Sequence, residues 1–285
     1  MRIDLHAHST ASDGTDTPAE VVRAARASGV DVLALTDHDT TSGWDPASAA
    51  LVAGQRLITG TEFSCVYTPA IGWPISLHLL GYLFDPAQAE LRAERVRLRE
   101  SRLGRARLIV EHMIADGLPI TWPRVAELAA GGSIGRPHIG RALVEAGVVP
   151  DVTAAFAGPL SSRSGYYVPK RDLDIFRALA LVDAAGGVSV FAHPLARRRG
   201  PVLDDAAIHD LADAGLGGLE VDHPDHSSAD RAHLRVLARD RDLIVTGSSD
   251  YHGTNKTTPL DAGTTAEDQY RRLVAQATGA QPITG

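Results

Sequence analysis

Cysteine is nearly absent from this chain: Cys65 is the only one among 285 residues. No internal disulfide can therefore form, and a structural zinc site made of four cysteines is excluded. Long apolar runs are absent as well, since no stretch approaches the roughly 18 residues that a membrane span requires. The N-terminus has no basic leader followed by an apolar segment. These absences predict a cytoplasmic protein without a membrane span.

Positive charge is in the minority, because 28 Lys and Arg face 35 Asp and Glu and give a formal net charge of −7. General nucleic-acid binding is therefore disfavoured, although a local basic site is compatible with the sequence. What the chain does have is histidine, 12 in all, several of them beside Asp or Glu. Imidazole and carboxylate together suit Zn²⁺, Mn²⁺ or Fe²⁺, so the composition indicates a metal site.

Seven short apolar runs predict β-strands, and helix-like segments separate most of them. The first helix is well marked: Thr17 offers an N-cap, Pro18 suits the first helical position, Glu20 completes a capping box and Gly29 can end the helix. Alternating strands and helices favour a parallel sheet or a β/α barrel. The predicted strands cover residues 2–8, 30–36, 56–61, 75–82, 187–192, 218–221 and 243–247, and the later helices residues 173–185, 204–214, 228–239 and 266–277.

The alternation stops in the middle of the chain, where helices are predicted one after another at residues 89–115, 122–130 and 139–146. The first is rich in arginine but also carries Glu94 and Glu100, which is typical of a solvent-exposed helix face. We therefore predict an α/β protein: a barrel formed by residues 1–86 and 166–285, interrupted by a helical insertion subdomain at residues 87–165. The chain length suits one barrel of this kind.

Each predicted strand carries His, Asp or Glu near one end. In the first, His6 and His8 alternate with apolar residues and so point to the same side of the backbone. A single such residue can be a hydrogen-bonded core histidine or a helix-capping aspartate and needs no metal. To explain the whole set in this way, the same alternative would have to apply independently at seven strands. In a β/α barrel the C-terminal strand ends meet at one mouth, where the active site lies. The set predicted to meet there comprises His6, His8, Asp13, Asp37, His38, Glu62, His78, His193, Glu220, His223, Asp250 and His252.

These motifs resemble the four motifs of the polymerase and histidinol phosphatase (PHP) family. The four residues from Gly135 to His138 are similar to the branch that contains nucleoside 3′,5′-bisphosphate 5′-phosphatases and short-RNA 5′-exonucleases. The resemblance implies a distorted (β/α)₇ barrel of the PHP type. It spans nearly the whole chain outside the insertion and rests on His6-x-His8, Asp13, Thr36-Asp37-His38, Glu62, His78, His193 and Asp250-Tyr251-His252.

The resemblance also implies a cluster of two or three divalent ions, Mn²⁺, Zn²⁺ or Fe²⁺. Glu62 would be shared by two of them. Asp37 is expected at the catalytic centre, where it would orient a ligand, and Glu220 is expected to do the same. Carried over to this chain, the resemblance would place one metal on His6, His8, Glu62 and Asp250, a second on Glu62, His78 and His193, and a third on Asp13, His38 and His252.

Phosphate recognition needs positive groups beside the metals. Arg136, His138, Lys170 and Arg197 stand near Pro or Gly in loop-like positions and are candidate phosphate ligands, although a solvated surface position explains each equally well. His223 could contact the phosphate or protonate the departing oxygen, and a surface histidine is the alternative. The remaining histidines lack the strand-end pattern and are expected to be structural: His112, His209, His226 and His233.

The function that these expectations support is hydrolysis of a phosphate monoester by a metal-bridged hydroxide. The substrate would be the 5′-phosphate of a nucleoside 3′,5′-bisphosphate or short oligonucleotide, including short RNA, and no obligate protein partner is indicated. A histidinol-phosphate phosphatase is the second enzyme hypothesis, and a non-catalytic metal-binding module is the alternative of another class. A metal-dependent amide hydrolase is disfavoured because no lysine precedes Lys170. Ser-His-Asp catalysis is disfavoured as well, because the Gly-x-Ser-x-Gly at residues 131–135 falls between two predicted helices and not at the strand-to-helix turn that such a nucleophile requires.

Overall fold

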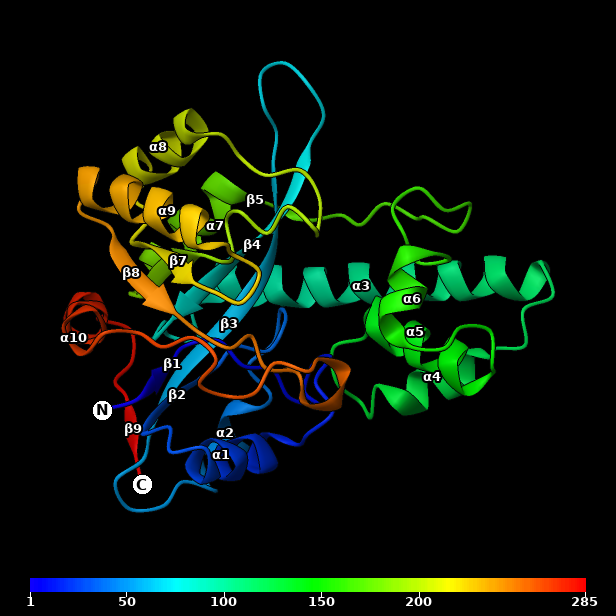
Figure 1. Ribbon diagram of the computed structural model, residues 1–285, viewed down its shortest axis with the longest axis horizontal. Helices are drawn as coiled ribbons and strands as arrows, with labels where there is room; N and C mark the ends of the chain where they lie inside the picture. The colour runs from blue at the N-terminus through cyan, green and yellow to red at the C-terminus, as the bar shows by residue number, and fades with distance from the viewer.

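A computed structural model describes residues 1–285, and one sheet organises its barrel (Figure 1). Seven strands follow one another around this sheet, and a bridge between Ala7 and Tyr251 joins the chain after the first strand to the chain after the last. The sheet is nearly closed, so the distorted barrel predicted from the sequence is confirmed. Its strands are β1 (Ile3–Asp4), β2 (Val32–Leu35), β3 (Arg56–Tyr67), β4 (Ile75–Tyr82), β6 (Val188–Phe191), β7 (Gly218–Asp222) and β8 (Ile244–Gly247).

Strand β4 runs antiparallel to both its neighbours, whereas the other adjacent pairs of this series are parallel. The reason is the connection: only residues 68–74 join β3 to β4, and so short a link allows a hairpin but no crossover. The expectation that strands present their polar residues at C-terminal ends is therefore wrong for β4. His78 lies in the first half of β4, which is the half nearer the mouth.

Strand lengths also differ from the predicted ones. The first strand pairs with β2 only at Ile3–Asp4. Beyond it, the backbone N–H of His6 donates to the Asp4 carboxylate (3.4 Å) instead of to a neighbouring strand. Strand β3 continues to Tyr67, so Glu62 lies inside it rather than at its end. Two short strands that were not expected also pair with β3, namely β5 (Leu173–Asp174) and β9 (Ile283–Thr284).

Helices cover the outside of the barrel, and most of them follow the predicted ranges closely. The first has the predicted capping box: Glu20 N donates to the Thr17 hydroxyl (3.3 Å), and Thr17 N donates to the Glu20 carboxylate (2.8 Å). The short second helix was not expected. These helices are α1 (Pro18–Ala27), α2 (Trp44–Ser48), α7 (Ile175–Ala184), α8 (Asp205–Asp213), α9 (Ser228–Asp240) and α10 (Glu267–Gln276).

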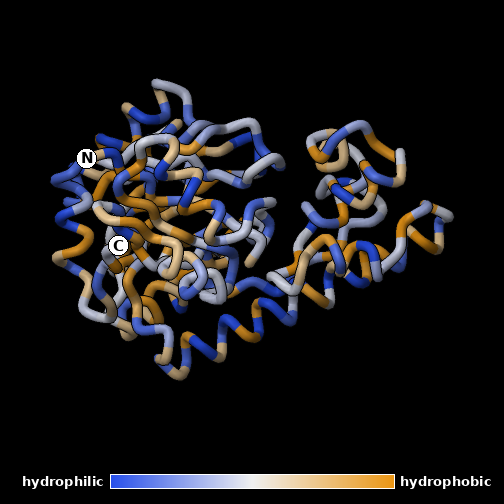
Figure 2. The backbone as a smooth tube through the Cα atoms, turned by 90° about the horizontal axis from the view of Figure 1, so that it is seen from below, coloured by the Kyte–Doolittle hydropathy of each residue, from blue (hydrophilic) through white to orange (hydrophobic).

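The insertion stands to one side of the barrel, as Figure 2 shows from below. The long α3 (Ala89–Ala115) starts against the barrel, and its second half packs with three shorter helices around an apolar core of their own. One of these begins at Arg136 rather than at residue 139, because Pro137 fits the first turn of a helix and does not mark a loop. No helix of the chain is both long and apolar enough to cross a membrane. The shorter helices are α4 (Trp122–Leu128), α5 (Arg136–Glu145) and α6 (Val152–Ala157), of which α6 was not expected.

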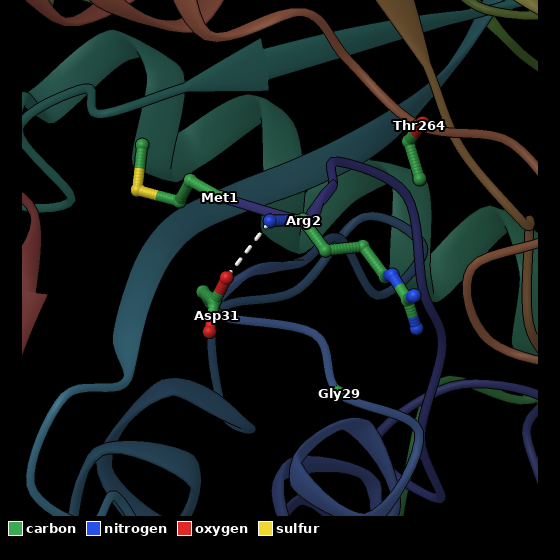
Figure 3. A pocket seen from close by; sticks show the side chains of 5 residues that line it. All are labelled: Met1, Arg2, Gly29, Asp31 and Thr264. Carbon is green, nitrogen blue, oxygen red and sulfur yellow. Dashed lines mark hydrogen bonds between the residues drawn. The ribbon is translucent and has the colours of Figure 1, made fainter.

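A hollow lies at the end of the barrel where β1 and β2 begin (Figure 3). Its polar groups are paired: Arg2 N donates to Asp31 Oδ2 (2.8 Å), and the Arg2 guanidinium donates to Ser28 O (2.7 Å) and Asp261 (3.0 Å). No histidine lines it. The predicted site residues lie at the opposite end of the strands.

Gly132, between α4 and α5, brings the insertion against the barrel. A Cβ atom on it would come within 2.2 Å of Thr10 O, and the adjacent Ser133 N donates to Ala11 O (2.8 Å). The loop that leads to Asp13 is thus held by the insertion.

Gly132→Val should destabilise the protein, because the new side chain fits only if the two loops separate. We expect the free energy of unfolding to fall by about 1–3 kcal/mol, the usual cost of overpacking, and the melting temperature in a calorimetric scan to fall with it. Gly165→Val is the control, since a Cβ at Gly165 meets no atom within 4 Å. Equal melting temperatures for the two variants would contradict the prediction.

Candidate metal centre

The nine residues predicted as metal ligands come together in one cluster at the mouth of the barrel. Eight of them are buried, and His78 is the most exposed, with 27% of its side chain open to solvent. They come from the interiors of β3 and β4 and from the loops that follow β1, β2, β6 and β8. So many buried titratable groups are stable only when they neutralise one another or share a cation.

Three donor atoms face one another in this cluster, namely His6 Nε2, His8 Nε2 and Asp250 Oδ1, and Glu62 Oε2 lies beside the two imidazole nitrogens. The glutamate oxygen lies 3.2 Å and 3.1 Å from the two imidazole nitrogens, and the aspartate oxygen lies 3.6 Å from each. The nitrogens themselves are 3.0 Å apart. Donors that share an ion at about 2.1 Å lie roughly 3.0–3.4 Å from one another, so His6, His8 and Asp250 lie near the spacing that one divalent ion requires.

Glu62 also faces a second group. Its other oxygen, Oε1, lies 2.7 Å from His78 Nδ1 and 3.0 Å from His193 Nε2. One carboxylate therefore stands between two sets of imidazoles, which is the arrangement of a shared ligand.

A third group forms around Asp13, whose carboxylate lies 3.6 Å from His38 Nε2 and 3.4 Å from His252 Nε2. His38 belongs to two neighbourhoods, because its Nδ1 is 3.2 Å from Glu62 Oε2. The structure thus brings together each predicted set, with His38 between the third set and Glu62.

The carboxylates are held in their ionised form. Burial alone would raise the pKa of Glu62, but the facing His78 and its neighbours keep that pKa well below its usual range. Burial would likewise raise the pKa of Asp250, and Lys256 and Arg199 keep it low. Ionised carboxylates are the form that binds metal.

The imidazoles divide into two kinds. Burial lowers the pKa of His193 to about 3, and burial together with Lys256 lowers the pKa of His252 to about 4, so both rings are neutral near neutral pH and able to coordinate a metal. Burial would also lower the pKa of His6, but the surrounding Glu220, Glu62 and Asp250 raise it well above its usual value. The same negative potential favours a cation beside His6, and this cation can bind the imidazole once Nε2 has lost its proton.

Glu220 orients two of the predicted ligands. Its Oε1 lies 2.9 Å from His6 Nδ1, and its Oε2 accepts a hydrogen bond from His193 N (2.7 Å). An imidazole that donates Nδ1–H to a carboxylate presents the lone pair of Nε2 to a metal. His193 and Asp250 also have positive φ angles, 33° and 52°, a strained conformation that recurs at functional sites.

Asp37 lies beside the centre and organises a loop. Its carboxylate accepts hydrogen bonds from Ser9 N (2.8 Å), Ser9 Oγ (2.7 Å) and Ser12 Oγ (2.6 Å). Both oxygens are therefore engaged with the segment that leads to Asp13, a position that suits orientation rather than proton transfer.

Three positive or polarisable groups meet at the second oxygen of Asp250. Arg199 and Lys256 each lie 2.6 Å from Oδ2, and His223 Nε2 lies 3.2 Å from it. Arg197, the arginine of this loop predicted from the sequence as a phosphate ligand, instead pairs with Asp230 and is largely exposed. The run of three arginines gave no signal to choose between them, and Lys256 reaches the centre from a loop without a recognisable motif.

Arg136 and His138 do not stand in a loop, as expected, but in the first turn of α5. His138 is buried, and its Nδ1 accepts a hydrogen bond from Gly135 N (3.0 Å), so it caps its own helix. The Arg136 guanidinium lies over Phe156 and donates to Leu160 O (3.1 Å).

Lys170 and Arg136 belong to a second cationic cluster, defined here as Arg102, Arg105, Arg136 and Lys170. Burial lowers the pKa of Lys170 to about 8 and that of Arg136 to about 10, and nearby arginines of α3 add to both shifts. Lys170 lies 2.8 Å from Asp172, and Arg102 pairs with Asp39. Arg105 and Arg136 donate only to backbone carbonyls, so positive charge is in excess.

Comparison with known proteins identifies related sequences and structures. Residues 4–109 match the PHP domain. A 3′,5′-nucleoside bisphosphate phosphatase of Chromobacterium violaceum is 34% identical over 88% of this chain and 87% of its own length. A 5′-3′ exoribonuclease of Haemophilus influenzae is also 34% identical, over 88% of this chain and 90% of its own. The solved structure of a protein called a metal-dependent phosphoesterase, from Bifidobacterium adolescentis, matches with a TM-score of 0.91 at 36% identity, over 97% of this chain and 96% of that one.

Glu220→Gln should weaken metal binding without unfolding the barrel, because an amide accepts hydrogen bonds through one atom only. Loss of such an orienting group typically lowers metal affinity by about 10- to 100-fold. Competition with a chelator for Mn²⁺ measures the change. Asp222→Asn is the matched control, since the Asp222 carboxylate pairs with Arg235 at the surface (2.6 Å). Unchanged affinity in Glu220→Gln would remove the orienting role.

Proposed function

Because the chain belongs to the PHP family and is a metal-dependent phosphoesterase, we propose that it removes the 5′-phosphate of a nucleoside 3′,5′-bisphosphate or of a short oligonucleotide. The single observation that carries this substrate is the second cationic cluster, which consists of residues other than the predicted metal ligands and reaches Asp39, beside His38, through Arg102. A monophosphate has no use for a second anion site. The relatives named as a bisphosphate phosphatase and an exoribonuclease support the same substrate class.

We propose that the three side-chain groups, two of which share Glu62 while the third surrounds Asp13, hold three divalent ions, Mn²⁺, Zn²⁺ or Fe²⁺. The chemistry of the donors supports this, since each set combines a carboxylate with imidazoles. Three close groups of donor atoms support it as well: His6, His8 and Asp250; His8, Asp13, His38 and His252; and His38, Glu62 and His78. When bound, such ions acidify water and neutralise the phosphoryl oxygens. Glu62 keeps two of these groups at a fixed separation because its two oxygens face different imidazoles.

Arg199, Lys256 and His223 are proposed to meet the reacting phosphate at the edge of the metal centre. His223 Nδ1 accepts a hydrogen bond from Asp225 N (3.0 Å), so the ring carries its proton on Nε2, which points to Asp250. That N–H is placed to donate a hydrogen bond to an oxygen of the reacting phosphate. Asp37 acts through the loop that it holds.

The second cationic cluster is proposed to hold the 3′-phosphate. Guanidinium and ammonium groups donate charge-assisted hydrogen bonds to phosphate oxygens. Histidinol phosphate fits less well, because its amine carries positive charge and would be repelled by the same groups. A metal-bridging lysine, which an amide hydrolase of this architecture would use, is not provided by Lys170, since this side chain pairs with Asp172.

Purified protein loaded with Mn²⁺ should contain three ions per chain, because three donor groups are present. His252→Ala should lower the content to two by removing a ligand of the group around Asp13, whereas His233→Ala, at a surface histidine paired with Asp205, should leave it at three. Elemental analysis after gel filtration measures this. A wild-type content of one ion, with no rise on adding Mn²⁺ or Zn²⁺, would contradict the three-metal arrangement.

Arg136→Ala or Lys170→Ala should reduce kcat/KM for a 3′,5′-bisphosphate far more than for a 5′-monophosphate. Each lost charge-assisted contact is worth roughly 1.5–3 kcal/mol, which corresponds to about a tenfold to a hundredfold loss. Arg197→Ala is the control, because its guanidinium is exposed and pairs with Asp230. Equal losses on both substrates would place these residues at the reacting phosphate or in folding, and faster hydrolysis of histidinol phosphate would overturn the nucleotide substrate.

A further inference from the structure

The hairpin between β3 and β4 carries the two most exposed large apolar side chains of the protein. At its tip, residues 68–74, Ile71 is 94% and Trp73 is 88% exposed, whereas no other large apolar residue exceeds 48%. Figure 1 shows the hairpin extending beyond the helices that surround the barrel. At its base Tyr67 and Ile75 pack against the core, so the base of the hairpin is anchored to the barrel.

The hairpin begins at the candidate metal centre. Its two strands carry Glu62 and His78, and side chains two residues apart on a strand share a face, so Ser76 follows His78 on the side toward the mouth. Ser76 Oγ donates to Asp172 Oδ2 (2.9 Å), and the other oxygen of Asp172 lies 2.8 Å from Lys170 Nζ.

From the centre outward, β4 therefore passes the predicted metal ligand His78, then a position beside Lys170, and then the tip. Trp73 is five residues beyond His78, which is about 17 Å along an extended strand. A bound ligand that extended from the metal centre to Trp73 would therefore pass the positive charge of Lys170.

The size of the tip decides what it can bind. A stable protein interface needs about 20–30 residues on each side, and this tip has seven residues with two large apolar side chains. One exposed indole offers instead a flat face for a single base, and a neighbouring cation suits the phosphate that precedes that base.

We propose that Trp73, flanked by Ile71, is a stacking platform for a downstream base of an oligonucleotide whose 5′-phosphate lies in the metal centre. This proposal rests on the proposed function and adds a subsite to it. A nucleoside bisphosphate ends at the second cationic cluster and does not reach the tip. The platform therefore raises the activity toward oligonucleotides relative to bisphosphates.

The test is the ratio of kcat/KM for a 5′-phosphorylated tetranucleotide to kcat/KM for adenosine 3′,5′-bisphosphate, both measured with Mn²⁺. Trp73→Ala should lower this ratio by about fivefold to a hundredfold, the usual effect of losing one base–aromatic stack. Trp73→Phe should restore most of it, because a phenyl ring also stacks. Val52→Ala is the control at another exposed apolar residue and should leave the ratio unchanged. A wild-type ratio in Trp73→Ala would overturn the platform.

A binding measurement separates this proposal from the proposed function. A tetranucleotide with a non-hydrolysable 5′-phosphonate and a 3′ fluorescein label is titrated with each Mn²⁺-loaded variant, so that no turnover occurs, and fluorescence anisotropy reports the Kd. Weaker binding by Trp73→Ala supports the platform even if wild-type protein hydrolyses neither nucleotide, which would overturn the proposed function alone. Equal binding by wild type and Trp73→Ala, or no binding by the wild type, would overturn the platform, and so would a dimer in light scattering that Trp73→Ala converts to a monomer.

Discussion

The centre is organised around one buried carboxylate, that of Glu62, which faces different histidines with its two oxygens. One oxygen lies within 3.2 Å of His6 and His8, and the other within 3.0 Å of His78 and His193. A buried carboxylate is destabilising by several kcal/mol unless cations or hydrogen-bond donors surround it. Closing the sheet brings those donors to Glu62 from both sides, so barrel closure and charge neutralisation depend on each other.

The reversed direction of β4, which its short connection to β3 dictates, brings a histidine to the same carboxylate. In the antiparallel pair, His78 lies opposite Ser64 and Leu80 lies opposite Glu62, which places His78 and Glu62 as diagonal neighbours on one face. A hairpin delivers this histidine directly from the adjacent strand. It also extends β3 well past Glu62, and the surplus length becomes the arm that carries Trp73 away from the barrel.

Features with local signals could be predicted from the sequence, and features that depend on long-range packing could not. The capping box of α1 and the polar residues that interrupt the apolar runs of β2, β6 and β8 are local signals, so these elements could be predicted. The nine residues predicted as ligands do lie together, and their role as ligands stays a prediction. The direction of β4 depends on its partners, and the choice of Arg199 over Arg197 depends on how one loop folds over Asp250. The start of α5 was predicted three residues too late, because proline suits both a turn and the first turn of a helix, and Pro137 was taken to mark a loop.

Helix α3 ties the two parts of the proposed site together. Arg95, Arg99 and Arg102 lie on one face of it and contact the segment after His38: Arg95 donates to Thr41 Oγ1 (2.7 Å), Arg99 donates to Asp39 O (3.3 Å), and Arg102 pairs with the Asp39 carboxylate.

The same helix supplies Arg102 and Arg105 to the second cationic cluster. A single rigid element therefore sets the distance between the strand end that carries His38 and the groups proposed to hold the 3′-phosphate. If the second cationic cluster holds the 3′-phosphate, this fixed distance would favour substrates whose two phosphates have the matching spacing, because a phosphate held in one place brings the other to the centre only if the span matches. No movement of the insertion is required for that selection, and its contact through Gly132 with the loop before Asp13 fixes the same distance from the other side.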